Sequence, residues 1–350
     1  MSDAVDIFSQ QASNRRRSRL LVVVFIAFFA WLGFGGDYIA YEYTRLGSAR
    51  GYHHVFPWIG LLLTAVGIGI AWWGWTTGPQ RVLAAAGARE VLDPRTDRER
   101  VLVDCVEEMA IASGLPKPRI WIVPDDDPNA FATGHDERDA NIAVTAGLLA
   151  TLSRDELQAV IGHEMGHVKN HDVQLMTLLA GLVGAIALVA DGMSRRGVVR
   201  VGGGGSGSRG DRNRGGGGGG GPLLVILLIV YIVSWILAPI LSRVLAAWVS
   251  RGREYLADSM SAQFTRNPMA LAGALEKIGA AVAPTKSVKQ SFAHLCIADP
   301  AGRAVNSREG GVADLLATHP PLALRISRLR AMGYQEQKRA GTFVAPVTTT

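Results

Sequence analysis

Four apolar stretches restrict what this 350-residue chain can fold into, and they span residues 20–36, 55–75, 173–190 and 223–241. A helix needs about 17–25 apolar residues to cross the hydrocarbon core of a bilayer. Hydrophobic residues make up 48 % of the chain and charged residues only 19 %, a low charged fraction for a soluble protein. These features predict an integral membrane protein with four apolar segments.

Basic residues indicate how these segments are oriented. A cluster of four arginines at positions 15–19 precedes the first stretch, and such clusters remain on the cytoplasmic side. The second segment then returns the chain, which places residues 76–171 in the cytoplasm. The loop between the third and fourth segments carries six arginines, the wrong charge for an external loop. Two alternatives therefore remain. Either both segments cross the membrane against the preference of basic loops for the cytoplasmic side, or they form a hairpin that dips into the bilayer without fully crossing it.

The remaining composition excludes several classes of protein. The net charge is +6, but the arginines lie beside apolar segments and no nucleic-acid-binding motif accompanies them, so we expect lipid headgroups rather than nucleic acid as the partner. The two cysteines lack metal or redox spacing. Residues 202–221 are mostly glycine without a phosphate-loop context, which predicts a disordered linker. The tail 341–350 is also expected to be disordered.

A soluble region with mixed structure is predicted between the second and third apolar segments. Helical periodicity covers residues 98–113 and ends at a glycine and a proline. Short strands are expected at 119–123, 130–133 and 141–145, separated by turn residues. Ser153 and Glu156 form a capping box that starts another helix. No proline interrupts this helix, which is expected to continue through His171 into the third apolar segment.

The helix that begins at Ser153 carries the sequence His163-Glu-Met-Gly-His167, an HExxH motif. Residues i and i+4 share one helix face, so both imidazoles can bind a single zinc ion. Glu164 then lies beside the metal-activated water and can serve as general base. The structural alternative is an amphipathic helix with two incidental histidines.

Two histidines are too few for a zinc site, so a third ligand is required. His171 lies about 12 Å along the helix from His163 and cannot share the ion, and Val173 stands where an extended motif would place a third histidine. Glu254 and Asp258, again at i and i+4, offer a ligand and a supporting carboxylate. They follow the fourth apolar segment, so both helices meet the membrane on the same side. The alternative is a solvated helix face paired with arginines.

Several motifs together resemble the HtpX family of membrane-bound zinc metalloproteases, which is distantly related to the CAAX prenyl proteases. The resemblance covers roughly residues 55–335. The matching segments are Asn129-Ala-Phe-Ala-Thr-Gly134, Ile142-Ala-Val-Thr145, His163-Glu-Met-Gly-His-Val-Lys-Asn-His-Asp172, Arg253-Glu-Tyr-Leu-Ala-Asp258, Ala293-His-Leu295, Thr318-His-Pro-Pro321 and Arg325-Ile326.

The resemblance implies roles for these residues. It implies one zinc ion per chain on His163, His167 and Glu254, with Glu164 as general base and Asp258 orienting a ligand. It also implies that an edge strand pairs with the substrate backbone, and the strand comprises Asn129, Ala130, Phe131, Ala132 and Thr133.

Two further residues match family positions near the metal. His319 and Arg325 are expected either to stabilise the tetrahedral oxyanion or, for His319, to occupy the open metal position in a resting state. The structural alternative for His319 is a turn at His-Pro-Pro.

The sequence therefore predicts an α+β, mainly helical integral membrane protein with a zincin-type metalloprotease domain and a small β-sheet. Residues 1–75 hold the N-terminal tail and two spans, 76–172 and 242–340 form the protease domain, and 173–241 hold the third and fourth segments. The expected function is cleavage of proteins in or near the inner membrane, from the cytoplasmic face, and the family resemblance implies a role in quality control. The alternatives are a CAAX-type prenyl protein protease and a non-catalytic scaffold. The oligomeric state stays undetermined.

Overall fold

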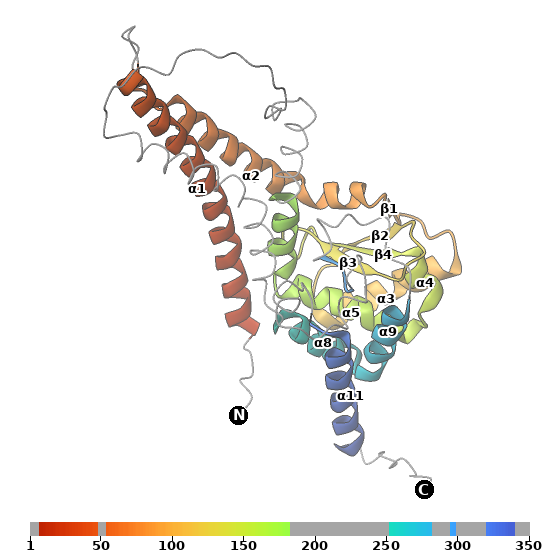
Figure 1. The fold of residues 1–350 in the computed structure, drawn as a ribbon. Coiled ribbons are helices and arrows are strands. Elements are labelled where there is room, and N and C mark those ends of the chain that lie inside the picture. Colours follow the sequence, from red (N-terminus) through yellow and green to blue (C-terminus); the bar gives the residue numbers. More distant parts are fainter. Residues whose placement is uncertain (1–6, 48–53, 183–251, 282–294, 299–319, 340–350) are drawn as a thin grey trace, which may run out of the picture. The chain divides into compact units, whose positions relative to one another are not determined.

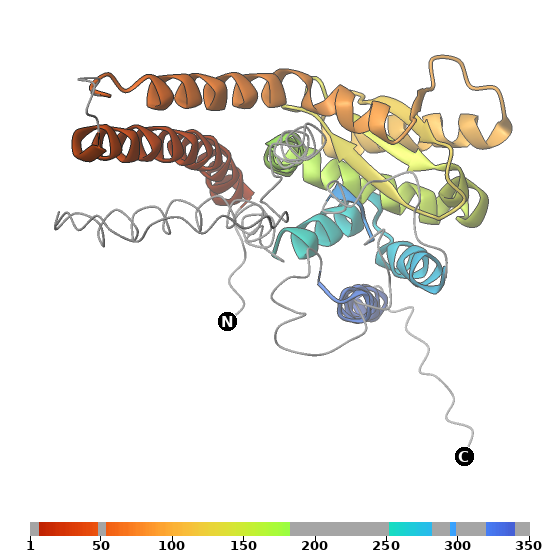
Figure 2. The ribbon, with the colours of Figure 1, turned by 45° about the horizontal axis from the view of Figure 1, so that its top comes forward.

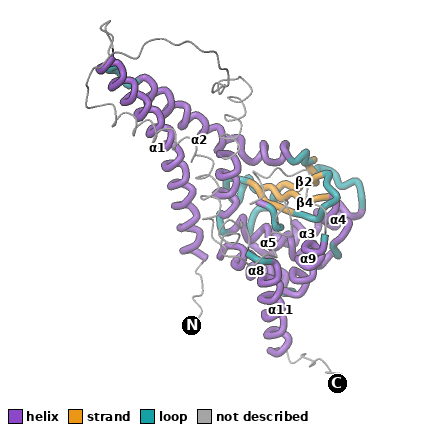
Figure 3. The backbone as a smooth tube through the Cα atoms, viewed as in Figure 1, coloured by secondary structure: helices purple, strands orange, loops and turns teal. Residues whose placement is uncertain are grey.

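The computed structural model describes residues 7–47, 54–182, 252–281, 295–298 and 320–339. Its elements in chain order are α1 (Ile7–Gly47), α2 (Trp58–Ala85), β1 (Arg89–Glu90), α3 (Asp97–Ser113), β2 (Arg119–Val123), β3 (Ala130–Thr133), β4 (Asn141–Thr145), α4 (Ala146–Thr151), α5 (Arg154–Lys169), α8 (Gly252–Thr265), α9 (Pro268–Ala280) and α11 (Leu322–Arg339). Figure 1 shows these elements along the chain, and Figure 3 distinguishes the helices from the small sheet. The prediction of a mainly helical α+β protein with a small sheet is confirmed.

Contacts divide the chain into two compact units. One unit comprises the described parts of 1–19, 75–181 and 244–350, and the other those of 20–74 and 182–243. The predicted division into domains assigned the first 75 residues to the membrane part as a block. By contacts, residues 7–19 belong to the unit that contains the HExxH motif, and the predicted division into domains stays a prediction.

Helices α1 and α2 contain the first two predicted spans. Within the described residues, Gln11–Arg45 and Trp58–Ala85 are long and apolar enough to cross a membrane. The helix of the first span is longer than its apolar stretch and begins at Ile7, ahead of the arginine cluster. Asp37 of α1 accepts hydrogen bonds from the backbone N–H groups of Ile59 and Gly60, which caps the start of α2.

Only the beginning of the third apolar segment belongs to the described residues. It forms an apolar helix, Asp172–Leu182. The rest of that segment, the fourth segment, the 202–221 linker and the 341–350 tail lie outside the described residues.

The four-stranded sheet has the order β1-β2-β4-β3 and mixed pairing. Strands β2 and β4 run parallel, with Ile120 beside Ile142, whereas β1 and β3 pair antiparallel with β2 and β4. The three predicted strands are confirmed at the expected residues, and β1 and α4 are additional elements that the pattern did not predict. The order leaves β3 at one edge of this sheet.

One hydrophobic core joins the sheet to the helices of the first unit. Helix α5 packs on β3 and contacts α3, α8 and α9, and α11 packs on α9 and α8. Figure 2 shows α5 between the sheet and the pair α8 and α9, with α11 outside them. Fully buried members of the core include Leu102, Val106, Ile142, Val144, Val160, Ile161 and Leu275. Helix α5 is therefore the central helix of this unit.

The prediction of one continuous helix from Ser153 into the third apolar segment is wrong. Helix α5 ends at Lys169, and His171 has a φ of 56°, in the left-handed region. A new helix starts at Asp172. Neither glycine nor proline marks this break. The local signal is Lys169 in the last turn followed by the C-cap residue Asn170, and the prediction did not use it.

Candidate metal centre

Helix α5 presents both histidines of the HExxH motif to one point. Its first turn is held by the predicted capping box, in which Ser153 and Glu156 each satisfy the other's backbone N–H. From this start, His163 and His167 lie one turn apart with their Nε2 atoms 3.2 Å from each other. The i, i+4 spacing of the two histidines therefore predicted correctly that their rings lie together on one helix face.

Glu254 of α8 completes a three-residue cluster. Its Oε2 lies 3.7 Å from Nε2 of His163, and its Oε1 lies 3.6 Å from Nε2 of His167. Ligand atoms from the three residues all fall within 4.8 Å of one another. Ligands about 2.0–2.1 Å from a tetrahedral zinc ion lie about 3.4 Å apart, so this cluster has the size of a zinc site.

A close approach of α5 and α8 brings Glu254 to the histidines. Gly166, between the two histidines in the helical turn, faces the backbone of Ala257, and a Cβ at Gly166 would lie 3.2 Å from the Cα of Ala257. A glycine at this contact lets the two helix backbones approach each other.

Each metal-facing histidine is oriented by a carboxylate at its other ring nitrogen. Nδ1 of His163 lies 3.0 Å from Oδ1 of Asp258, and Nδ1 of His167 lies 3.0 Å from Oδ2 of Asp172. If each Nδ1–H donates to its carboxylate, both Nε2 lone pairs point at each other and at Glu254. A cation among these atoms would be stabilised by their electron pairs, so the donor set of the three residues fits a metal ion.

Arg325 of α11 lies behind this cluster and is fully buried. Its Nε and Nη2 bind Oδ2 and Oδ1 of Asp258 at 2.9 and 2.7 Å, and its Nη1 lies 3.2 Å from Oε2 of Glu254. Burial alone would raise the pKa of Asp258, but the charge of Arg325 and the hydrogen bond with His163 hold that pKa below its usual value. Arg325 thus contacts both carboxylates of α8, and its expected role at an oxyanion stays a prediction.

The pKa values of the two histidines differ in direction. Burial lowers the pKa of His163 to about 4, against the opposing effect of Asp258. Burial also acts to lower the pKa of His167, but Asp172 and Glu254 outweigh this effect and raise the pKa to about 9. The protein groups around His167 therefore favour positive charge at that position.

Glu164 lies beside the cluster with its carboxylate almost fully buried. Neither of its oxygens has a hydrogen bond of normal geometry with the residues that the structure describes. Burial raises its pKa to about 7, while nearby positive groups and the Ala132 amide act in the opposite direction. Burying a carboxylate without such partners costs free energy of folding, and groups of this kind are concentrated at functional sites. The burial of Glu164 is therefore consistent with the predicted general base.

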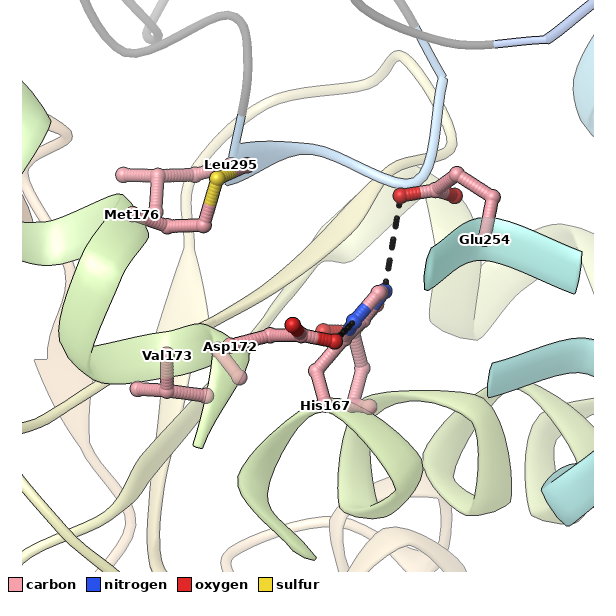
Figure 4. Close-up of a pocket in the computed structure, with 8 residues that line it drawn as sticks. His167, Asp172, Val173, Met176, Glu254 and Leu295 are labelled. Carbon is pink, nitrogen blue, oxygen red and sulfur yellow. Dashed lines mark hydrogen bonds and ion pairs between the residues drawn. The ribbon is translucent and has the colours of Figure 1, made fainter. Parts of the chain in front are cut away.

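A small pocket opens onto these groups. Figure 4 shows His167 between Asp172 and Glu254, and Met176 and Leu295 line the same pocket. The lining residues are Ala132, Glu164, His167, Asp172, Val173, Met176, Glu254 and Leu295. Charged groups thus line one part of the pocket and apolar side chains the other.

The predicted substrate-binding strand Asn129–Thr133 coincides with edge strand β3 and its preceding residue. Part of this edge is paired already: Cys296 forms an antiparallel bridge with Phe131, and the N–H of Ile297 donates to the carbonyl of Ala130. Asn129 also donates its side-chain amide to the carbonyl of Ala298. Ala132 lines the pocket beside Glu164 and His167, and the predicted pairing of this strand with a substrate stays a prediction.

The structure describes all but one of the predicted site residues. His319 lies outside the described residues, so the alternatives for its role stay open. Three residues that the sequence reasoning did not assign also belong to the site: Asp172, and Arg253 and Asn14, which both contact Asp172. Asp172 stands inside the quoted motif and could have been assigned a role by its proximity to His167, whereas Asn14 lies 158 residues away and has no local signal.

Comparisons with known proteins identify the family. The model of peptidase family M48 matches residues 96–333. A protease HtpX homolog from Thermoanaerobacter pseudethanolicus is 36 % identical over 327 residues, which are 93 % of this chain and 98 % of that protein. A protease HtpX homolog from Streptococcus agalactiae is 38 % identical over 327 residues, with 93 % and 100 % covered.

A crystal structure of S. mikatae Ste24p shares 18 % identity and covers 92 % of this chain and 67 % of its own, with a TM-score of 0.41, too low to carry an argument. The chain therefore belongs to peptidase family M48 and is a metalloprotease.

Proposed function

We propose that this chain is a membrane-bound, zinc-dependent endopeptidase, with His163, His167 and Glu254 as metal ligands and Glu164 as general base. The observation that carries the proposal is the convergence of three ligand atoms within 4.8 Å. Two imidazole nitrogens and one carboxylate oxygen are a ligand set of catalytic zinc sites.

The surrounding residues support zinc rather than a chance cluster. Asp258 and Asp172 hold the Nδ1 atoms of the two histidines, which leaves both Nε2 atoms free to bind a metal. When bound, zinc supplies Lewis acidity that lowers the pKa of a water molecule and polarises the scissile carbonyl.

Glu164 performs the proton transfers in this proposal. Its carboxylate lies in the pocket beside His167 and Glu254. It takes the proton that the attacking water loses and returns this proton to the amine nitrogen as the peptide bond breaks. The raised pKa of about 7 suits a group that both accepts and donates a proton near neutral pH.

The substrates that we propose are proteins in or beside the membrane. Helices α1 and α2 meet the length and composition required for crossing a bilayer. The substrate backbone pairs with edge strand β3, because Ala132 of this strand lines the pocket beside Glu164 and His167. A role in quality control at the cytoplasmic face of the inner membrane belongs to the same proposal.

The test is Glu164→Gln in the detergent-purified chain. We expect cleavage of an unfolded membrane protein to fall at least about 100-fold, because general-base catalysis contributes roughly that much or more. Zinc should remain at one ion per chain, because Glu164 is not a ligand.

Glu107→Gln is the matched control, since Glu107 is an exposed glutamate of α3 that pairs with Lys117. This control should retain full activity. Retained proteolysis in Glu164→Gln would disprove the general-base role, and an active wild-type protein without stoichiometric zinc would disprove the metal assignment.

A further inference from the structure

Asn14 lies far from the catalytic motifs in the sequence but is buried against them in the fold. It belongs to the first turns of α1, ahead of the first apolar stretch, and none of its surface is exposed. Neighbouring Gln11 donates its side-chain amide to the carbonyl of Lys169 at 2.6 Å. The start of α1 therefore packs against the end of α5, the helix that carries the histidines.

The amide of Asn14 makes two hydrogen bonds to this region. Its Nδ2 donates to the carbonyl of Asn170 at 2.9 Å and to Oδ1 of Asp172 at 2.6 Å. Both partners only accept hydrogen bonds, so they fix which way the amide points. The reversed amide would place its carbonyl oxygen against two acceptors.

Asp172 connects this amide to the proposed metal centre. Its Oδ1 accepts from Asn14, while its Oδ2 lies 3.0 Å from Nδ1 of His167. Asp172 follows directly after the break at His171, so α5 does not hold it in place. Arg253 supplies a positive charge 3.5 Å from Oδ1 but makes no closer contact with Asp172. The short hydrogen bond from Asn14 therefore restricts rotation of the carboxylate that orients His167.

We propose that Asn14 is a positioning residue for the metal ligand His167 and acts through Asp172. The segment of α1 before the first apolar stretch then helps to orient a metal ligand, in addition to the effect of its arginines on membrane orientation. This inference rests on the proposed zinc site.

The test measures metal binding in the full-length chain in detergent, with Glu164→Gln in all proteins to prevent self-digestion. Asn14→Leu removes both N–H donors while it keeps the branching and the number of side-chain heavy atoms. We expect the zinc dissociation constant, measured by chelator competition, to rise up to about tenfold, because outer-shell partners of zinc-binding histidines contribute about 10- to 100-fold and Asn14 acts one residue further out. The visible spectrum of the cobalt-substituted protein should also change.

Two further variants separate positioning from packing. Gln11→Ala loses a hydrogen bond to the same region without touching Asp172, so it should leave the zinc dissociation constant and the cobalt spectrum unchanged. Asn14→Asp places two carboxylates together and should weaken zinc binding. Adding Asp172→Asn to it should recover part of the loss, because the new amide at position 172 can donate to position 14 while its oxygen accepts from His167.

The outcomes distinguish the two proposals. If Asn14→Leu leaves both measurements unchanged while Asp172→Asn alone alters them, the inference about Asn14 is wrong and the zinc site stands. The inference is equally wrong if Asn14→Leu and Gln11→Ala weaken zinc binding to the same extent. If Asn14→Leu does not fold, the absence of any recovery in the double variant would overturn it. A Glu164→Gln protein that binds no stoichiometric zinc would overturn the proposed function instead.

Discussion

Individual buried charges determine how the metal centre holds its shape. Arg325 is fully buried and contacts the carboxylates of Asp258 and Glu254 together with the carbonyl of Ile297. Removing one partner of a buried ion pair leaves the other charge without compensation, at a cost of about 3–5 kcal/mol. The arginine therefore matters to the free energy of unfolding as well as to the geometry of the proposed zinc ligands.

We expect Arg325→Met to reduce the free energy of unfolding by about 3–5 kcal/mol, because it leaves two carboxylates buried beside each other. Denaturant or thermal unfolding of the detergent-solubilised protein measures this loss. Arg330→Met is the matched control on the same helix, because Arg330 and its partner Glu276 are both about half exposed.

An exposed pair of this kind contributes less than about 1 kcal/mol. Equal losses of stability in Arg325→Met and Arg330→Met would show that the buried network does not have the stabilising role assigned to it.

At the scale of helices and strands, the site depends on how closely α5 and α8 approach. The histidines come from α5 and Glu254 from α8, so a change in the distance between the two helices changes the distances between the proposed ligands. Gly166 faces Ala257 at the contact. The start of α5 depends in turn on the Ser153–Glu156 capping box, which is linked to α9 by an ion pair of Glu156 with Lys277.

Gly166→Val should separate α5 from α8 and weaken zinc binding, because the added side chain meets backbone atoms that cannot rotate away. Overpacking of this kind costs about 1–3 kcal/mol in stability. Chelator competition and thermal unfolding measure the two effects.

Gly273→Ala on α9 is the control, since its added methyl group meets only a side-chain oxygen of Glu156. This substitution should leave zinc binding unchanged. Unaltered zinc affinity in Gly166→Val would mean that the close helix contact is not what brings Glu254 to the histidines.

The capping box predicts a pH dependence of stability. Burial acts to raise the pKa of Glu156, but Lys277 and the Ser153 hydrogen bonds outweigh it and hold that pKa below 4.5. A carboxylate with a lowered folded-state pKa stabilises the protein above its unfolded pKa, and this contribution is lost as the pH falls through the folded value.

Glu156→Gln should therefore be less stable than wild type at pH 7, with the difference shrinking as the pH falls below 4.5. Urea unfolding at a series of pH values measures it. A difference that stays constant over this range would contradict the assignment.

At the scale of the whole molecule, the main prediction concerns the orientation of the protein in the membrane. Helices α1 and α2 are the candidate spans within the described residues, and the arginine cluster predicts that the catalytic unit faces the cytoplasm. Residues 7–19 group with the catalytic unit, which supports the prediction that the arginine cluster and this unit lie on the same side of the membrane. The crossing of the third and fourth segments stays a prediction.

Cysteine labelling tests this orientation. Tyr43 near the end of α1 and Ile111 on α3 are both strongly exposed. An impermeant maleimide should label Tyr43→Cys in intact spheroplasts but Ile111→Cys only after lysis.

The native thiols should give little background in this experiment. Burial raises the pKa of the Cys105 thiol to about 11, and Cys296 is also buried. Labelling of Ile111→Cys in intact spheroplasts would reverse the predicted orientation.

Local patterns in the sequence were sufficient for much of the protein. The i, i+4 spacing of His163 and His167, the capping box at Ser153 and the three alternating strands are properties of short segments, and the structure has all of them at the expected residues. The family resemblance rested on such segments as well and is confirmed by the M48 match.

The tertiary structure alone decided which distant residues meet at the centre. The break at His171 turns Asp172 back toward His167, and the packing of α1 brings Asn14 to Asp172 across 158 positions of the chain. Arg325 likewise reaches two carboxylates of another helix. Such contacts follow from how helices pack and where backbones turn, and periodicity within one segment carries no information about a partner in another.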